Sequence, residues 1–373
     1  MSDKDIYREI QKRWDTVAKP LNSLGTFEDM ICRIGTVQGS IMPDISKRAV
    51  IIMCADNGIV EEGVSQCGQD VTAEVAGWMG RRESTVCRMA EHAGADIIPI
   101  DIGINMKGSP EGVTDRKIRR GTSDFLNEPA MSLNEMRQAV KTGIETVKDC
   151  RDKGYGILAT GEMGIGNTTT ASAVCAALTG IAVSEVTGRG AGLSDTAYER
   201  KLEVIERGIK LHGLRQASDR KIMQDLKSAS DPDDRAYMTE QESSITDASG
   251  QAERALSCVG GLDIAGLAGV FIGGARYNVP VIIDGFISAV AALCAERMEP
   301  GTKKAMIASH MGKEAGMAYV MKELGLKPVI DAGMALGEGT GAVMLFPLLD
   351  MAAEIYRNGF RFEETGVEQY VRF

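Results

Sequence analysis

The sequence has few aromatic residues, and none of its hydrophobic runs is both long and free of polar residues. Aromatic residues make up 5% of 373 residues, so a core must be built largely from aliphatic side chains and the 20 methionines. The longest weakly charged run, Met163–Ser184, contains Asn167 and three successive threonines, which argues against a membrane span. The N-terminus alternates in charge and lacks the apolar stretch of a secretory signal. We therefore expect a cytoplasmic protein that does not contact a membrane.

The sequence also lacks an excess of positive charge and the spacings of a metal site. Its 52 acidic and 42 basic residues give a net charge of −10, which disfavours nucleic acid as a partner. The eight cysteines form no C-x-x-C pair and lie mostly in apolar stretches, so they are predicted to be reduced, small core residues. The three histidines are far apart, and only His310 follows a predicted strand, where it is expected to cap or hydrogen-bond. We expect neither a metal nor a cofactor.

Glycine is the residue that the sequence has in excess. The 43 glycines amount to about 12% of the chain, against a usual share of about 7%, and they follow no collagen period. Many of them occur in short clusters after predicted strands. Glycine is needed there where the backbone turns through positive φ or approaches a ligand closely. The glycine clusters are therefore the candidate functional segments.

Short apolar runs alternate with helical patterns along most of the chain, which predicts an α/β fold with a mostly parallel sheet flanked by helices. Residues 1–48 and 347–373 lack strands and are predicted to form a small helical domain beside a large α/β domain, 49–346. The charged segment 212–257 is predicted to be a helical excursion or a loop. The predicted strands are Ala49–Cys54, Asp96–Asp101, Tyr155–Thr160, Val279–Asp284, Lys304–Ser309 and Lys327–Asp331. The predicted helices are Phe27–Ser40, Gln69–Gly80, Ser132–Arg151, Thr168–Leu178, Asp195–His212, Ile264–Gly273, Phe286–Met298, Lys313–Leu324 and Ala342–Arg357.

The segment Gly161–Thr170 has the clearest ligand-binding character. It is predicted to follow a strand and to open a helix, where free backbone N–H groups and the helix dipole favour an anion. It lacks the Lys-Ser/Thr ending of a P-loop and the G-x-G-x-x-G spacing of a dinucleotide site, so a phosphate monoester fits better. A tight strand-to-helix turn, capped by Asn and Thr, is the alternative interpretation.

Two further glycine clusters carry one charged residue each. Arg189 lies within Gly188–Gly192 and could face a phosphate or a carboxylate, or remain solvated at a turn. Lys201 lies on the helix that follows, where a surface position is the simpler interpretation. Glu338 lies within Gly337–Gly341, where a carboxylate can project into a cleft as a general base. An exposed turn residue is the alternative for Glu338.

An ordered set of motifs runs over nearly the whole chain, from Lys19–Gly25 (KPLNSLG) to Leu336–Ala342 (LGEGTGA). Between them lie Asp56–Gly58, Glu62–Ser65, Val71–Thr72, Gly161–Thr170, Val259–Leu267, Asp284–Phe286 and Ser309–His310. This set closely resembles the nicotinate-nucleotide:dimethylbenzimidazole phosphoribosyltransferases of cobamide biosynthesis. The resemblance implies a Rossmann-like parallel sheet, a small helical domain and usually a homodimer. It implies transfer of the 5-phosphoribosyl group from nicotinate mononucleotide to a benzimidazole, giving an α-ribazole 5′-phosphate and nicotinate.

The resemblance also implies roles for individual residues. Glu338 is the expected general base, which accepts the ring N–H proton of the attacking base while the other ring nitrogen approaches the anomeric carbon. No metal is needed, because no pyrophosphate leaves. The residues expected to hold the phosphoribosyl group and nicotinate are Gly161, Glu162, Gly164, Gly166, Asn167, Thr168, Thr169, Gly188, Gly190, Lys201, Asp284, Gly337 and Gly339. The residues expected to line the base pocket are Asp56, Ser65, Cys67 and Leu336.

Three departures from the family pattern bear on the acceptor base. Asn57 stands where the family commonly has His, Cys67-Gly68 where it has a proline-containing pair, and Ala335 where it has Arg. The acceptor is therefore dimethylbenzimidazole, another benzimidazole, a purine or a phenol. One alternative is a nucleotide-binding subunit that forms a hetero-oligomer with a homologue and acts on such a different base. A phosphate-binding regulatory module is the third interpretation.

Overall fold

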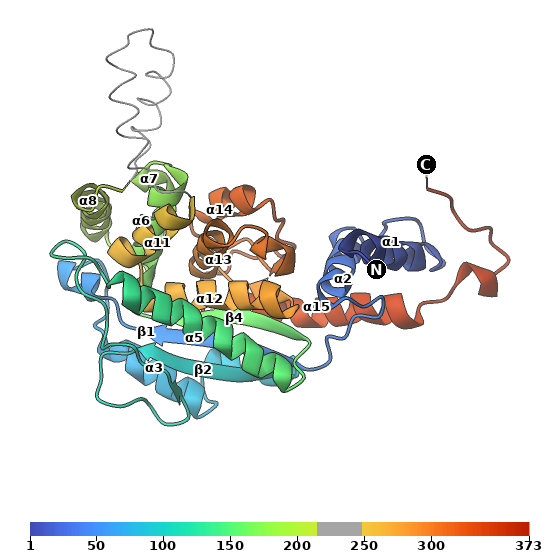
Figure 1. Ribbon diagram of the computed structural model, residues 1–373, viewed down its shortest axis with the longest axis horizontal. Helices are drawn as coiled ribbons and strands as arrows, with labels where there is room; N and C mark the ends of the chain where they lie inside the picture. The colour runs from blue at the N-terminus through green and yellow to red at the C-terminus, as the bar shows by residue number, and fades with distance from the viewer. Residues whose placement is uncertain (215–247, 373) are drawn as a thin grey trace, which may run out of the picture.

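The computed structural model describes residues 1–214 and 248–372 of the chain (Figure 1). Six parallel strands form one sheet in the order β3-β2-β1-β4-β5-β6. The chain winds from β1 to one side of the sheet and then, from β4 onward, to the other, which is a Rossmann-like topology. The predicted α/β fold with a parallel sheet is confirmed. The strands are β1 (Arg48–Ala55), β2 (Ala95–Gly103), β3 (Thr114–Asp115), β4 (Ile157–Met163), β5 (Val281–Ile283) and β6 (Met306–Ala308).

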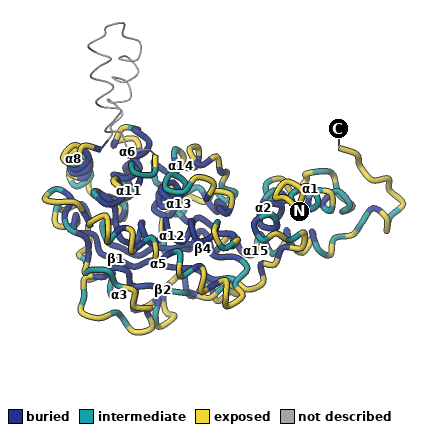
Figure 2. The backbone as a smooth tube through the Cα atoms, viewed as in Figure 1, coloured by how far each residue is buried: buried dark blue, intermediate teal, exposed yellow. Residues whose placement is uncertain are grey.

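Helices cover both faces of the sheet, so the central strand β1 is buried on both sides (Figure 2). Ile51 and Met53 point into one apolar cluster, whereas Val50 and Ile52 point into the other. Successive side chains of a strand alternate between faces, and a strand covered on both faces therefore needs apolar residues at consecutive positions. The run Val50-Ile51-Ile52-Met53 meets this need.

The first face is covered by helices that pack closely through glycine. A Cβ at Gly143 of α5 would lie 2.0 Å from the carbonyl oxygen of Gly266, and one at Gly269 of α12 would lie 1.9 Å from that of Val140. Part of the glycine excess therefore serves helix packing rather than a ligand. The helices of this face are α5 (Leu133–Asp152), α6 (Asn167–Thr179), α7 (Val183–Val186), α8 (Asp195–Leu211), α11 (Ala248–Val259), α12 (Leu262–Tyr277), α13 (Phe286–Met298) and α14 (Met317–Leu324).

The second face is covered by α3 (Asp70–Gly80), α4 (Thr85–His92) and α15 (Thr340–Asn358), whereas α1 (Asp3–Asp15) and α2 (Thr26–Gln38) share the same apolar cluster but lie beyond the sheet, with α2 packed on α15 (Figure 1). Helix α15 contacts β4 and α4 and continues to α2, so it joins the sheet to the N-terminal helices (Figure 1). The predicted domain boundary at residue 347 falls inside this helix, at Pro347. Within residues 1–214 and 248–372, three short 3₁₀ helices complete the elements: η1 (Gly58–Glu62), η2 (Thr302–Ala305) and η3 (Phe362–Glu364).

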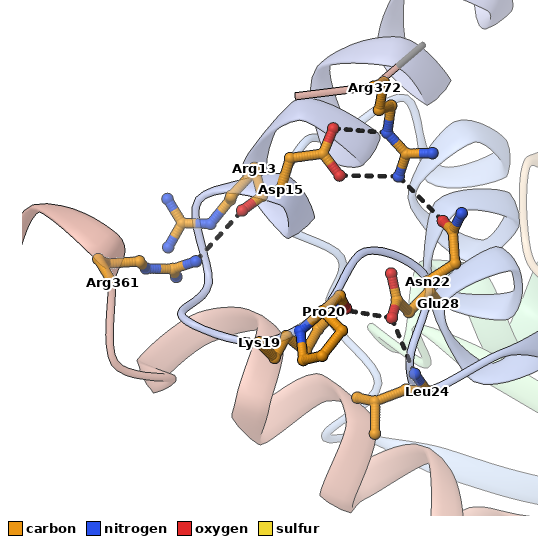
Figure 3. A network of polar contacts seen from close by, with 9 residues as sticks. All are labelled: Arg13, Asp15, Lys19, Pro20, Asn22, Leu24, Glu28, Arg361 and Arg372. Atoms are coloured by element: carbon orange, nitrogen blue, oxygen red, sulfur yellow. Dashed lines mark hydrogen bonds and ion pairs between the residues drawn. The ribbon is translucent and has the colours of Figure 1, made fainter. Parts of the chain in front are cut away.

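Polar contacts hold the N-terminal helices to the C-terminal tail (Figure 3). Arg372 donates two hydrogen bonds, of 2.6 and 2.7 Å, to the carboxylate of Asp15. Lys19 and Glu28 form an ion pair of 2.6 Å whose side chains are 15% and 6% exposed. Glu28 also accepts the Leu24 N–H at 3.0 Å. The motif that begins at Lys19 is therefore an anchored loop between α1 and α2.

Five of the six predicted strands are present, and the sixth prediction is wrong. In the run 327–331, only Ile330 forms an isolated bridge, to His310. Pro328 lacks the N–H group that a ladder requires, and the neighbouring strand β6 spans only three residues. Each predicted helix overlaps an observed helix, but α14 begins at Met317, four residues later than predicted. Helices α4 and α7 and strand β3 were not predicted.

The predictions for the cysteines and for the charged segment 212–257 are confirmed only in part. Of the eight free cysteines, six are buried as expected, Cys258 is half-buried and Cys67 is exposed. In the charged segment 212–257, helix α11 begins at Ala248, and residues 215–247 lie outside the described part of the chain.

Candidate active site

Glu338 lies in a turn of three residues with left-handed backbone at the start of α15. Gly337, Glu338 and Gly339 have φ values of 80°, 61° and 91°. A residue with a Cβ disfavours positive φ, so the flanking glycines hold Glu338 in a strained conformation. Its side chain is half-buried, and Oε2 is buried without a hydrogen-bond partner. Burial, and then the negative charge of Asp284, raises the pKa of Glu338. A carboxylate with a free oxygen and a raised pKa is suited to accept a proton.

Asp284, directly after β5, holds this turn in place. Its Oδ2 accepts the N–H of Gly339 at 3.0 Å, and its Oδ1 accepts the N–H of Ala342 at 2.9 Å. The carboxylate therefore caps the N-terminus of α15, where the helix dipole favours negative charge. Burial raises the pKa of Asp284, while the neighbouring His310 opposes the rise. Asp284 thus supports the position of Glu338 through the backbone.

The side chain of Glu162 lies directly against the turn that carries Glu338. Gly161 and Glu162 were predicted to lie in the loop after a strand, but both belong to β4, which runs on to Met163. A Cβ at Gly337 would lie 2.6 Å from Glu162 Oε1, and one at Gly161 would lie 2.6 Å from the carbonyl oxygen of Glu338. These two glycines let the strand and the turn pack in direct contact.

Glu162 and Asp263 form a buried pair of carboxyl groups that share one amide donor. Asn167 Nδ2 donates to Glu162 Oε2, and also to Asp263 Oδ2 at 3.0 Å. Burial, and then the charge of Asp263, raises the pKa of Glu162 to about 8, whereas burial raises the pKa of Asp263 to about 6. Burial and the neighbouring carboxyl group therefore favour the protonated form of Glu162, which can donate a hydrogen bond.

Lys201 is fully buried, so its interpretation as a surface residue is wrong. Its Nζ donates to Thr168 Oγ1 at 2.9 Å and to the carbonyl oxygen of Gly188 at 3.1 Å. Burial lowers the pKa of Lys201 to about 8, and the charge of Glu314 opposes the shift. The lysine thereby joins the N-terminus of α6 to the Gly188–Gly192 segment. A cation and free N–H groups at a helix start are the components of an anion site.

The carboxyl ends of β1 and β4 meet at the point where the strand order reverses. Asn57 is buried and donates from Nδ2 to the carbonyl oxygen of Ile165 at 3.4 Å, while its Oδ1 has no partner. A Cβ at Gly164 would lie 2.3 Å from the carbonyl oxygen of Ala55. Asp56 Oδ2 accepts the Asn105 N–H at 2.7 Å, and burial raises the pKa of Asp56. Ligands of such sheets bind at this reversal point.

The other predicted base-binding residues are more exposed. Ser65 is half-buried and accepts the N–H of Cys67 at 3.3 Å, and Cys67 itself is exposed. Leu336, which precedes the Glu338 turn, is 55% exposed. Gln66, between Ser65 and Cys67, donates to the carbonyl oxygen of Gly192. The segment after β1 therefore lies against the Gly188–Gly192 segment.

The remaining predicted residues lie among these groups. A Cβ at Gly166, which precedes α6, would lie 3.3 Å from that of Asn57, and Gly190 faces Thr168 Oγ1. Thr169 Oγ1 is buried without a partner. The structure thus brings together, at the carboxyl edge of the sheet, the residues predicted to bind the phosphoribosyl group. Their roles stay predictions.

A small cavity at this edge includes residues that the sequence analysis did not select. Its lining comprises Glu162, Asp284, Gly285, Phe286, Ile287, Ser288, His310, Glu314, Met334, Ala335 and Gly337. Glu314 Oε2 is buried without a partner, and burial raises the pKa of Glu314. Asp263 was also missed, although it follows the Gly260-Gly261 pair at a helix start. His310 was predicted to hydrogen-bond, and its Nδ1 lies 3.0 Å from Ser309 Oγ.

The rest of the described chain offers no competing site. A larger cavity of about 990 Å³ lies between α1–α2 and the ends of α12 and α14, and it contains none of the predicted site residues. Within residues 1–214 and 248–372, no group of three or more His, Cys, Asp or Glu side chains could hold a metal ion. No helix in these ranges has the length and apolar character needed to cross a membrane. The carboxyl edge of the sheet is therefore the candidate active site.

The fold and the site define a Rossmann-like α/β enzyme, and the chain belongs to the phosphoribosyltransferase family, which it matches over residues 1–229 and 234–367. The chain is similar to proteins named nicotinate-nucleotide–dimethylbenzimidazole phosphoribosyltransferase. The one from Acetivibrio thermocellus is 42% identical and covers 98% of this chain and 96% of the relative. The one from Clostridium acetobutylicum is 42% identical and covers 99% and 95%. The crystal structure of CobT from Thermus thermophilus superposes with a TM-score of 0.84 at 30% identity, covering 98% of this chain and 100% of that one. The resemblance seen in the motifs is confirmed.

Proposed function

We propose that the protein transfers the 5-phosphoribosyl group of nicotinate mononucleotide to 5,6-dimethylbenzimidazole or a related lower-ligand base. The products are an α-ribazole 5′-phosphate and nicotinate. The observation that carries the proposal is the buried, unpartnered Oε2 of Glu338 in a glycine turn at the carboxyl edge of the sheet. The names of the full-length relatives support the choice of substrates.

The proposed reaction is a displacement at the anomeric carbon. One ring nitrogen of the base attacks this carbon from the face opposite nicotinate, while Glu338 accepts the proton from the other ring nitrogen. The bond from the anomeric carbon to the pyridinium nitrogen breaks, and its electron pair stays on that nitrogen, so the ring loses its positive charge and leaves as nicotinate. The anomeric centre is inverted, and the proton remains on Glu338 until it passes to solvent. Alignment of the two rings supplies a large part of the rate.

The proposed binding residues divide into two groups. Lys201 and Thr168, with Gly188, Gly190 and the start of α6, hold the 5′-phosphate and the nicotinate carboxylate, because they offer a cation and N–H donors. The base pocket is formed by Asp56, Ser65, Cys67 and Leu336. Glu162, Asp284 and the flanking glycines support the turn that carries Glu338.

The family resemblance also supports further parts of the proposal. The enzyme acts as a cytoplasmic homodimer, with residues 1–48 and 347–373 as a helical domain beside 49–346. A hetero-oligomer with a homologue is the alternative. Light scattering of the purified chain distinguishes the two, because a homodimer has twice the mass of one chain.

The function is tested by incubating the protein with nicotinate mononucleotide and a panel of benzimidazoles, adenine and phenols. Mass spectrometry identifies the ribosylated product, and nicotinate release gives the rate. We expect 5,6-dimethylbenzimidazole or another benzimidazole to be ribosylated. Nicotinate release without ribosylation of any base in the panel would contradict the proposal. The absence of nicotinate release with every base would contradict it as well.

A further inference from the structure

Two side-chain contacts connect residues 62–66, which follow β1, with α8 and the residues just before it. Arg200 of α8 donates from Nε to the carbonyl oxygen of Glu62 at 2.6 Å, and its Nη2 pairs with Glu62 Oε2. Gln66 donates from Nε2 to the carbonyl oxygen of Gly192. The paired residues are 138 and 126 positions apart in the sequence. The two bridges therefore connect parts of the chain that only the fold brings together.

Arg200 also provides positive charge beside a group of acidic residues. Burial, and then the charge of Glu62, raises the pKa of Asp124, and the charge of Glu61 acts in the same direction. The negative charge of Glu62 therefore acts on the carboxyl group of Asp124. Without Arg200, no paired cation would compensate the charge of Glu62, and its repulsion from Asp124 would increase. Loss of Arg200 is expected to displace the segment around Glu62.

The Glu62–Arg200 bridge is too exposed to contribute much to the stability of the fold. The side chain of Arg200 is 47% exposed and that of Glu62 is 22% exposed. Ion pairs this accessible contribute little to the stability of a fold. Its consequence is local instead, because the bridges flank Ser65 and end next to Cys67, both proposed to bind the base. The opposite ends of the two bridges, Gly192 and Arg200, lie next to residues proposed to hold the nucleotide.

We propose that the two bridges couple binding of the acceptor base to binding of the nucleotide, with Arg200 as a positioning residue. The inference rests on the proposed function. A nucleotide bound beside Gly190 and Lys201 orders Gly192 and the first turns of α8, and the bridges then order residues 62–66. The base meets a pocket wall that is already in place. By linkage, bound base tightens nucleotide binding by the same factor.

Steady-state kinetics test the coupling with a matched pair of variants. Arg200→Met removes the charge and the donors but keeps a long side chain. Arg207→Met is the control, because Arg207 lies on the same helix and its partner Glu203, at 3.6 Å, is also in α8. We expect R200M to raise the KM for dimethylbenzimidazole about fivefold. Because linkage is reciprocal, its KM for nicotinate mononucleotide at saturating base should rise by a similar factor. Its kcat should stay within about twofold of wild type, and R207M should change none of these values.

An unchanged KM for the base in R200M would overturn the inference. Equal losses in R200M and R207M would overturn it as well, because any arginine of α8 would then have the same effect. If the wild type releases no nicotinate, the proposed function fails instead. The thermal midpoints of both variants should match that of the wild type, which separates positioning from loss of fold.

Cys67 provides a second readout that does not require turnover. It is exposed, whereas the other seven cysteines are buried or half-buried. Its alkylation by N-ethylmaleimide is followed by peptide mass spectrometry, with and without nicotinate mononucleotide. We expect the nucleotide to slow alkylation in wild type and R207M, and to lose this effect in R200M. Equal protection in R200M, or no protection in the wild type, would overturn the inference.

Discussion

At the residue scale, the site is defined by charged groups whose surroundings alter their protonation. Burial raises the pKa of Glu162 and Glu338 and lowers the pKa of Lys201. Such shifts are common where a protein performs acid–base chemistry. The sequence singled out Glu338 because glycines flank it, but it gave no sign that Lys201 is buried. Burial of a lysine depends on which distant segments cover it.

Substitution Glu338→Gln tests the general base. The amide cannot accept the proton, so we expect kcat for nicotinate release to fall about 10²- to 10⁴-fold. Nucleotide affinity, measured by calorimetry, should not change. The kcat/KM of the wild type should rise with pH through the raised pKa of Glu338, because the base acts when ionised. Glu323→Gln, which alters a surface pair with Arg297, is the control. Near-normal turnover of E338Q would refute the role.

The pH dependence of stability tests the buried Glu162. Its pKa is about 8 in the folded protein and 4.5 as the ordinary value. The folded state therefore binds the extra proton, and the stabilisation present below pH 4.5 is lost as the pH rises to about 8. We expect the free energy of unfolding in urea to decline over this window. The decline should be smaller in Glu162→Gln and unchanged in the exposed control Glu203→Gln. Parallel curves for E162Q and wild type would contradict the assignment.

At the element scale, strands and helices place the site at one edge of the sheet. The ends of β1, β4 and β5 deliver Asn57, Glu162 and Asp284, and α15 begins at the Glu338 turn. Apolar runs and helical periodicity predicted these elements, because both are local patterns. The run 327–331 failed, since Pro328 removes a ladder donor. The close contact of α5 and α12 was not predictable, because it depends on their positions in space.

Substitution by alanine should change the free energy of unfolding differently at a glycine in the α5–α12 contact and at a glycine outside it. In Gly269→Ala, the Cβ would lie 1.9 Å from the carbonyl oxygen of Val140, so we expect the free energy of unfolding to fall by about 1–3 kcal/mol or more. In Gly77→Ala on α3, the nearest group is the end of the Arg81 side chain at 3.3 Å. Higher helix propensity should make this variant neutral or up to about 1 kcal/mol more stable. Equal urea midpoints for the two variants would contradict the packing argument.

At the scale of the whole molecule, α15 links the candidate active site to the N-terminal helices. It starts at the Glu338 turn, crosses the second face of the sheet and ends beside α1 and α2 (Figure 1). The C-terminal tail then returns to Asp15 and Asn22 through Arg372. The two chain ends therefore pack into one structure. Helices in both end regions were predictable from their patterns, but their association required the fold.

Two ion pairs of this region should differ in their importance (Figure 3). Lys19→Met leaves the nearly buried carboxylate of Glu28 without its cation, so we expect a loss of about 3 kcal/mol in the free energy of unfolding. Arg372→Ala removes a more accessible partner of Asp15 and should cost at most about 1 kcal/mol. Urea denaturation of both variants provides the measurement. A larger loss in R372A than in K19M would contradict this order.

The sequence by itself determined the class of fold, most of its elements, the family and the position of Glu338. These depend on local signals, such as apolar runs, glycine turns and short motifs, that neighbouring residues express without the rest of the chain. Tertiary structure alone decided the burial of Lys201, the pairing of Glu162 with Asp263, the capping role of Asp284 and the contact of Arg200 with Glu62. Each of these joins residues far apart in the sequence, and their charges respond to burial, which arises only when distant segments pack together.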